Sequence, residues 1–340
     1  MRKTTLLLLV PALMLAACSS EKPADHSPDG YHRPLPTPSE AAVRQHIPDP
    51  QATDTLLPTV TGPFGARATI SVPKAVPTGR FVVMPMNEGR GRAARNGDAA
   101  IVKYSAVVWK TGKHLPDSYA AGAHPRVFSV GRGSILAALD RAVHGQRAGS
   151  RVLVVAPAAA AYGSTGNARL GVSGKDTIVF VVDVMRVIAA HETITGSQAD
   201  VSEDLPRVRM NRAQGTAAIT VPDHGAPVEL TVEPLVTGAG PVVKSGQTVV
   251  LQHSSTAWES ARGKDQGELF MSSHAAGEPL IALIGRGNVL PGWDKALVGQ
   301  RVGSRVLVVI PASLAYGEHP PKGITANTSV VSVLDVLAAA

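Results

Sequence analysis

The chain contains almost no cysteine, since Cys18 is the only one among its 340 residues. An intrachain disulfide needs two cysteines, so each folded unit of this protein has to be stable through its apolar core alone. Histidines are more numerous, but His224, His253, His274 and His319 lie at no spacing that is typical of metal ligands. We therefore expect neither a metal site nor a cofactor.

Aromatic side chains are also scarce, with 3 Trp, 5 Tyr and 5 Phe in a chain of net charge +7. The basic residues are scattered and form no stripe interleaved with aromatic residues, which argues against nucleic-acid binding. Anionic lipid headgroups or wall polymers would attract such a chain weakly and in a salt-dependent way. The glycine pairs that begin at Gly131 and Gly285 do not complete a dinucleotide-binding fingerprint.

Long apolar runs are missing as well, because the longest, Leu6–Leu15, is too short for a stable membrane-spanning helix. It follows Arg2 and Lys3 and leads through small residues to Cys18, an order similar to that of bacterial lipoproteins. The resemblance implies a lipoprotein signal peptide with a lipobox at residues 1–18, and a lipid on Cys18. The mature protein would then be extracytoplasmic and anchored to the cell membrane. An ordinary secretory signal with a chance cysteine is the alternative.

Residues 19–56 are rich in Pro, Ser, His and Asp and carry no periodic apolar pattern. Such composition is typical of a disordered or polyproline-like tether. At roughly 3 Å per residue, this tether could reach about 100 Å from the anchor.

What is present in the sequence is a repeat, because GQRAGSRVLVV at 145–155 returns as GQRVGSRVLVV at 299–309. A period of domain size indicates two copies of one domain, each with its own core. We place the first domain at 57–190, a linker at 191–204 and the second domain at 205–340. The second copy holds five extra residues near ESARGKDQGELF, which we expect to form an exposed loop.

Each copy combines short runs of Val and Ile with one helical pattern. The runs are bounded by Gly, Pro and Asn, which predicts strands, and the helical pattern places apolar residues four apart. The expected fold class is α+β, with an antiparallel sheet wrapped on one short helix in each domain. The blocks upstream, from about Leu57 and Leu205, would add a hairpin or a strand to each copy. The predicted strands are 100–109, 151–156 and 177–187, then 248–258, 305–310 and 329–337, and the predicted helices are 136–144 and 291–298.

The segment Val289–Glu318, VLPGWDKALVGQRVGSRVLVVIPASLAYGE, carries a family resemblance. It resembles FKBP-type peptidyl-prolyl cis-trans isomerases, in particular the secreted actinobacterial ones with tandem domains. The resemblance covers about 81–187 and 230–337, and implies a rotamase and folding assistant that acts on proline-containing polypeptides. We expect a monomer without bound nucleic acid.

The resemblance also implies a substrate pocket in the second copy. Trp293 would form its floor, with Phe270, Val289 and Leu290 on the walls, and with His253 and Leu280 as further substrate-binding residues. The backbone N–H of Leu290 and the hydroxyl of Tyr316 would donate hydrogen bonds to the substrate. The alternative is that Trp293 and Tyr316 merely fill the core.

The second copy departs from the family pattern at three positions. The tyrosine of the first strand is His253, the aspartate after Phe270 is Met271, and the phenylalanine of the last strand is Ser332. His253 is either a neutral donor in the wall or an ordinary surface or core histidine. We expect some loss of rate from these changes.

The first copy departs from the family pattern at a different set of positions. It keeps Tyr104, Phe180 and Tyr162, with Ile135 and Leu136 on the wall, as its substrate-binding residues. A leucine replaces the floor tryptophan, and the aspartate is displaced by one residue. We therefore expect the second domain to be the more active, and the first to resemble a binding or spacer module.

Two alternatives to an enzyme remain. Both copies could be degenerate isomerase folds that bind unfolded chains or a partner, or the chain could be a solute-binding lipoprotein, although those have many more helices. Asp140 and Asp294 stand just after the pocket position, where we expect them to face solvent or the helix dipole without chemistry.

Overall fold

The computed structural model describes residues 47–211, 215–321 and 324–340. The expected signal peptide, Cys18 and most of the expected tether therefore lie outside the described residues. Among the residues that are described, no helix has the length and apolar character to cross a bilayer.

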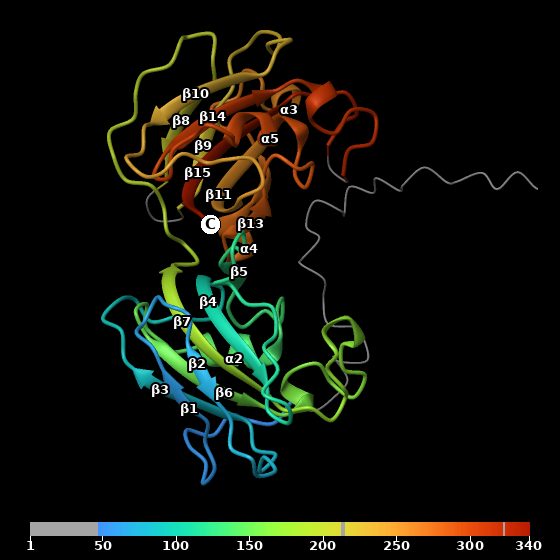
Figure 1. Ribbon diagram of the computed structural model, residues 1–340. Helices are drawn as coiled ribbons and strands as arrows, with labels where there is room; N and C mark the ends of the chain where they lie inside the picture. Colours follow the sequence, from blue (N-terminus) through green and yellow to red (C-terminus); the bar gives the residue numbers. More distant parts are fainter. Residues whose placement is uncertain (1–46, 212–214, 322–323) are drawn as a thin grey trace, which may run out of the picture.

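The first domain is built on a five-stranded antiparallel sheet with the strand order β3-β6-β7-β4-β5 (Figure 1). One short helix, α2 (Ala137–Val143), packs on this sheet with Leu139 and Val143 buried. The expected sheet on one helix is confirmed, and the predicted strand bounds differ from the observed ones by one residue at most. The strands are β3 (Val82–Asn87), β4 (Ala99–Val108), β5 (Arg126–Ser129), β6 (Arg151–Ala156) and β7 (Ile178–Ile188).

The second domain repeats this plan in a six-stranded sheet with the order β10-β14-β15-β11-β12, in which β13 also pairs with β11. Its helix α5 (Pro291–Leu297) begins with a proline, whose fixed φ favours the first helical position. The strands are β10 (Thr231–Val236), β11 (Thr248–Ala257), β12 (Leu269–Ser272), β13 (Leu280–Leu283), β14 (Arg305–Ile310) and β15 (Val330–Ala339). Two further short helices are α3 (Trp258–Ala261) and α4 (Ser273–Ala276). The inserted residues after α3 are exposed, as expected.

The upstream block of each copy forms a hairpin, β1 (Thr59–Thr61) with β2 (Thr69–Ser71), and β8 (Arg207–Met210) with β9 (Ala217–Thr220). Each hairpin covers the sheet face opposite to the helix, because its apolar residues share a cluster with the strand residues that alternate away from the helix. The two faces of each sheet are therefore both buried, which explains why strands such as β6 and β14 are continuous Val and Leu runs instead of alternating ones.

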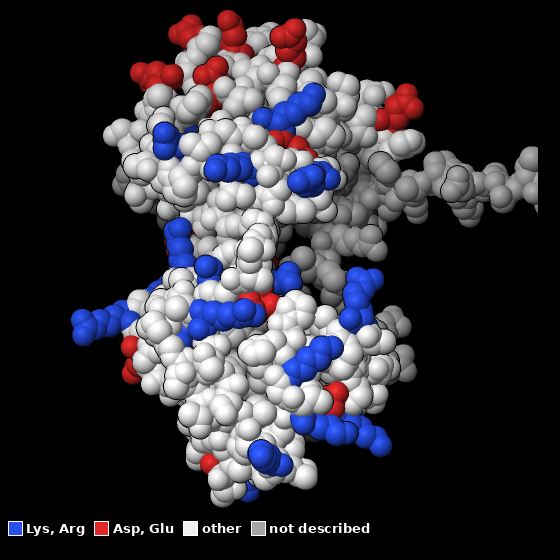
Figure 2. Space-filling model, viewed as in Figure 1, with Lys and Arg blue, Asp and Glu red and all other residues white. Residues whose placement is uncertain are grey.

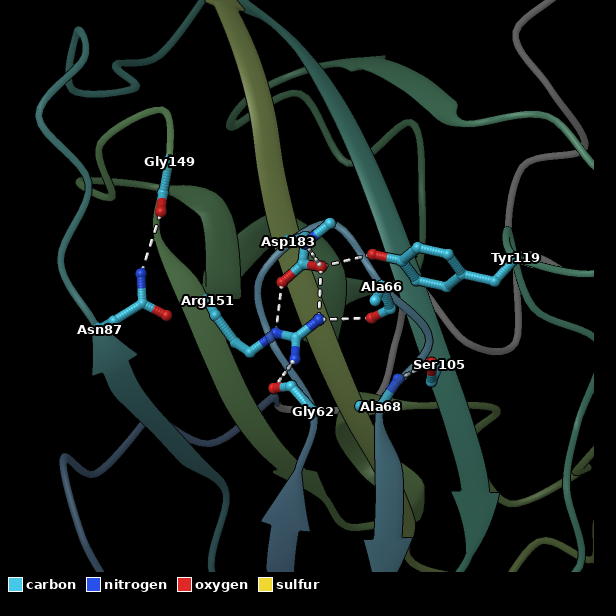
Figure 3. Close-up of polar contacts among 10 residues, drawn as sticks. Gly62, Ala66, Ala68, Asn87, Ser105, Tyr119, Gly149, Arg151 and Asp183 are labelled. Carbon is cyan, nitrogen blue, oxygen red and sulfur yellow. Dashed lines mark hydrogen bonds and ion pairs between the residues drawn. The ribbon is translucent and has the colours of Figure 1, made fainter.

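Each of the two sheets contains a buried ion pair between an arginine and an aspartate on neighbouring strands. Arg151 and Asp183 stand directly opposite each other on β6 and β7, and two N–H groups of the arginine donate to the carboxylate at 2.6 Å each. The same guanidinium donates to the carbonyls of Gly62 and Ala66 in the β1–β2 loop, and Tyr119 donates its hydroxyl to Asp183 (Figure 3). The hydrogen bonds to Asp183 raise the pKa of Arg151, and burial and the same carboxylate raise the pKa of Tyr119.

The equivalent pair in the second domain holds a different segment. Arg305 and Asp335 pair at 2.7 Å, and the guanidinium donates to the carbonyl of Ile194 and the side chain of Gln198. Asp335 in turn accepts the backbone N–H of Ile194 at 2.9 Å. The segment expected to be a loose linker is thus fixed to the second domain at its middle.

The first domain begins earlier than residue 57, where the tether was expected to end. Gln51 donates its N–H to the carbonyl of Phe81 at 2.8 Å, and Ile47 packs against the core beneath the helix. Ile47 and Leu56 are partly buried against the apolar clusters of the domain, so this part of the tether assignment is corrected.

The two domains meet at the start of β4 and the start of β11. Ala99 and Ile188 of the first domain share an apolar cluster with Val250 and Leu337 of the second. Gln252 also donates to the carbonyl of Ala190 at 2.7 Å across this contact. The opposite ends of the two sheets therefore form the two ends of the molecule (Figure 1).

Asp140 and Asp294 bind glycine loops in addition to standing in the first turn of their helices. The carboxylate of Asp294 accepts the N–H groups of Gly285 and Gly287 at 2.8 and 2.6 Å, and Asp140 does the same for the first copy. Gly285 and Gly287 both have φ above +70°, a region that side chains disfavour. The expectation of a purely solvent-facing or dipole role was incomplete.

Candidate active site

The floor of the candidate site in the second domain is Trp293, which points from α5 onto the sheet and is 3% exposed. Its indole N–H donates to the hydroxyl of Ser332 on β15 at 3.0 Å, and that hydroxyl lies 2.8 Å from the hydroxyl of Ser255 on β11. The position where the family has a phenylalanine thus supplies a polar partner for the indole.

The imidazole of His253 lies beside this floor, with its ring centre 5.1 Å from that of Trp293. His253 is 4% exposed, and its backbone N–H donates to the hydroxyl of Ser273 at 2.9 Å. Of the two interpretations of this histidine, the surface one is wrong, because the ring is enclosed between the sheet and the indole. Its contact with Trp293 makes it part of the same cluster of side chains.

The rim above the floor is apolar and partly open to solvent. Phe270 and Tyr316 meet edge to face with ring centres 6.2 Å apart, and both are half-buried. Val289 and Leu290 are each 3% exposed and join Leu280 in the same apolar cluster. Trp293 therefore shares one apolar cluster with the other predicted apolar residues of the second copy, and His253 lies beside its indole.

The position of the family aspartate is apolar in this domain. Met271 pairs with Ser255 across the β11–β12 ladder and packs against the core cluster that includes Trp293. The site consequently depends on hydroxyl, imidazole and backbone groups for its polar contacts.

The matching region of the first domain lacks the indole. Tyr104 and Phe180 meet edge to face with ring centres 6.1 Å apart, above a floor formed by the buried Leu139. Burial and, to a smaller extent, the nearby Tyr104 raise the pKa of Tyr162 to about 12, and Arg126 acts in the opposite direction. Two other predicted residues, Ile135 and Leu136, are half-buried against the same core.

The displaced aspartate of the first domain, Asp117, forms an ion pair. Asp117 is buried, its carboxylate lies 2.5 Å from the guanidinium of Arg67, and it also accepts the backbone N–H of Tyr119. Because Arg67 belongs to the hairpin that precedes the family core, no family pattern could have predicted this contact.

A pair of serines was also missed by the sequence reasoning. Ser118 accepts the backbone N–H of Tyr104 at 3.1 Å, just as Ser273 does for His253, so each fixes the strand that carries the wall residue. The signal in the sequence was a serine at the same place in both copies. In the described part of the chain, no three His, Cys, Asp or Glu side chains gather as metal ligands would.

The sequence of this chain is similar to those of known proteins. The sequence model of the FKBP-type peptidyl-prolyl cis-trans isomerases matches residues 90–185 and again 240–335. An FK506-binding protein of Streptomyces anulatus is 34% identical over 122 residues, which cover 35% of this chain and 94% of that protein. FK506-binding protein 4 of Saccharomyces cerevisiae is 33% identical over 101 residues, which cover 30% of this chain but only 24% of the yeast protein.

Two solved structures are also similar to parts of this chain. The three FKBP domains of wheat FKBP73 align with 76% of this chain and 94% of theirs, at 18% identity and a TM-score of 0.32. FkpA from Escherichia coli aligns with 32% of this chain and 47% of its own, at 32% identity and a TM-score of 0.28.

Proposed function

The chain belongs to the FKBP-type peptidyl-prolyl cis-trans isomerase family and is an isomerase of that type, and we propose that it assists protein folding outside the cytoplasm. In this proposal the protein is a lipid-anchored monomer whose clients are proline-containing polypeptides. The second domain carries most of the activity. The observation that supports this last point is that the second domain has the indole of Trp293 in one apolar cluster with the half-buried Phe270 and Tyr316, where the first domain has Leu139.

The reaction changes no covalent bond of the substrate. Rotation about the bond before proline has a barrier of about 18–20 kcal/mol, because the C–N bond has partial double-bond character. A site lowers this barrier if it binds the twisted amide more tightly than the planar one. An apolar slot contributes by receiving the proline ring and by keeping water from the amide.

The side chains of the second domain suit these tasks. The flat face of Trp293 would receive the proline ring, while Phe270 and Leu280 would close the sides. Tyr316 would donate its hydroxyl to a substrate carbonyl, as would the backbone N–H of Leu290, which precedes α5. The twisted amide no longer delocalises its nitrogen lone pair, so a polar group near that nitrogen favours the twisted state.

The first domain suits substrate binding better than catalysis. Leu139 offers no flat aromatic face, and the carboxylate of Asp117 is neutralised by Arg67. These two observations favour a second role for this copy, the holding of unfolded chains. Suppression of aggregation of a proline-free client that survives the change Trp293→Leu would support that role.

The catalytic proposal is tested with a protease-coupled assay on a proline tetrapeptide. The change Trp293→Leu gives the second copy the floor residue of the first, so the fold should tolerate it. We expect at least a tenfold loss of kcat/KM, whereas the matched control Leu139→Ala should leave the rate within a factor of two. Equal rates for the two variants and the unchanged chain would contradict the assignment of activity to the second domain.

The anchoring proposal rests on the sequence around Cys18, which lies outside the described residues. Labelled palmitate should be incorporated into the full chain expressed in a lipoprotein-processing bacterium, and the protein should fractionate with membranes. Cys18→Ser is the control. Membrane association and labelling that persist in this variant would contradict a lipid on Cys18.

A further inference from the structure

The two domains differ sharply in charge although they share one fold. Residues 57–190 contain 17 Lys and Arg and 6 Asp and Glu, whereas residues 191–340 contain 11 and 14. Figure 2 shows acidic side chains gathered at the far end of the second domain and basic ones spread over the first. The division of charge therefore follows the long direction of the molecule.

Three loops meet at the end of the first domain that lies away from the second. The side chain of Trp109, just after β4, donates to the carbonyl of Ala75 at 2.9 Å, and its backbone N–H donates to Thr177. Lys113 donates to the carbonyl of Leu170 at 3.0 Å. These contacts join the β2–β3 loop, the turn after β4 and the loop before β7 into one surface.

We call this surface the basic end. Its Lys and Arg residues are exposed and come from all three loops, namely Lys74, Arg80, Lys110, Lys113, Arg169 and Lys175. Two carboxylates lie nearby and are outnumbered by these six cations: Asp54 accepts hydrogen bonds from Thr78 and from the N–H of Thr55, and Asp176 accepts the N–H of Ser173.

An apolar side chain projects from the same end. Val76 is 86% exposed and lies in the β2–β3 loop between Lys74 and Arg80, with a proline on either side in Pro73 and Pro77. A protruding aliphatic group among cations is the arrangement that peripheral proteins present to a lipid interface.

The same three loops in the second domain carry the opposite charge. Trp258 repeats both contacts of Trp109, donating from its side chain to the carbonyl of His224 at 2.9 Å and from its backbone to Ser329. The loops after β9 and after β11 carry Asp223, Glu229, Glu259, Asp265 and Glu268, which we call the acidic end, and these outnumber Arg262 and Lys264 in the same loops. The fold therefore does not require the basic residues.

We propose that the basic end docks on a membrane surface of anionic phospholipid, with Val76 entering the headgroup region. Each Lys or Arg near such a surface strengthens binding roughly fivefold at physiological salt. Long side chains spread over three loops suit mobile headgroups, and a nearby lipid anchor would raise the effective concentration of the surface. The acidic end would be repelled by the same lipids, so the molecule would stand upright with its catalytic domain farthest from the membrane.

This inference rests on the anchoring part of the proposed function, but its test does not use the anchor. The chain from Ser19 onward keeps every described residue and lacks the lipidation site. Its binding to vesicles of phosphatidylglycerol and phosphatidylcholine is compared with binding to phosphatidylcholine alone. We expect sedimentation with the anionic vesicles only, and weaker binding as salt is raised.

Two sets of four substitutions distinguish the contribution of the basic end to vesicle binding from that of net charge alone. Lys74→Gln, Arg80→Gln, Lys110→Gln and Lys175→Gln together should weaken vesicle binding at least tenfold. The control set, Arg90→Gln, Arg95→Gln, Lys244→Gln and Arg286→Gln, removes the same charge elsewhere and should weaken it less than threefold. The single change Val76→Ser should weaken binding without altering its salt dependence.

Equal losses for the two sets of four, or equal binding to both kinds of vesicle, would overturn the proposal. Head-to-tail association of copies without vesicles, abolished by the first set, would assign the basic end to the acidic end of another copy instead. Isomerase activity on a tetrapeptide is measured in parallel and should be unchanged in both sets. A failure of docking is thereby distinguished from a failure of the isomerase function.

Discussion

Gly292 lies so close to Ile310 that a Cβ on the glycine would stand 2.3 Å from the isoleucine Cγ2. At this contact between α5 and β14, the helix has no side chain and the strand has a large one. In the first copy the matching residues are Ala138 and Ala156, both of them fully buried. The second copy therefore has its side-chain volume on the strand alone, whereas the first copy divides a smaller volume between helix and strand.

This relationship predicts a strong coupling between the two positions. Gly292→Ala should destabilise the second domain by about 1–3 kcal/mol through overpacking, although alanine favours a helix. Ile310→Ala should cost about 2–5 kcal/mol by leaving a cavity. The double variant copies the first domain and should be more stable than the sum predicts by at least about 1 kcal/mol. Urea unfolding measures each value, and additive effects would contradict the proposed exchange of volume.

The hydroxyl of Ser332 is predicted to stabilise the floor of the site. Ser332→Ala removes the acceptor of the Trp293 N–H, and a buried donor without a partner costs about 1–3 kcal/mol. Ser255→Ala serves as the control, because it leaves the bond between Trp293 and Ser332 in place. The urea midpoint followed by tryptophan fluorescence should fall further for Ser332→Ala. Equal midpoints would show that the indole finds another acceptor.

The two buried arginines, Arg151 and Arg305, should differ in the backbone segment that each one stabilises. Arg151→Met and Arg305→Met each leave a buried carboxylate without its partner, which is expected to destabilise by about 3–5 kcal/mol. Hydrogen exchange should increase in the β1–β2 loop for Arg151→Met, but in the segment around Ile194 for Arg305→Met. The same pattern of exchange in both variants would contradict the separate roles.

The contact between the domains should weaken in acid. His274 is 8% exposed and stacks on His191, with ring centres 5.6 Å apart. Burial lowers the pKa of His274, the neighbouring His191 lowers it further, and Asp335 opposes both. The unfolded chain therefore binds this proton more readily than the folded one, so the stabilising contribution is complete above about pH 6.5 and is lost as the pH falls below that value.

This pH dependence is measured by thermal unfolding at pH 7.5 and pH 5.5. The melting temperature of the unchanged chain should fall between the two, and His274→Gln should reduce the fall because the titrating group is gone. His144→Gln, at an exposed position, is the control and should change nothing. An equal fall in the chain and in His274→Gln would rule out this histidine as the cause.

Much of the fold could be predicted from local pattern. The six longest runs of Val and Ile gave strands to within two residues, because consecutive apolar β-branched residues have few other ways to be buried. The repeated GQR-GSRVLVV segment gave two domains, and Trp293 with Tyr316 gave the residues around one site. These features are local in sequence, so they can be recognised without coordinates.

The sequence alone therefore determined the duplication, the α+β class and the identity of the side chains around the indole. Only the tertiary structure decided that the upstream hairpins bury the second face of each sheet, that Arg67 neutralises Asp117, and that the arginines of the two repeats hold different segments. It also decided that three separate loops collect their charges at one end. Each of these joins residues far apart in the chain, and such pairings depend on how the sheets and loops pack, which leaves no local signature.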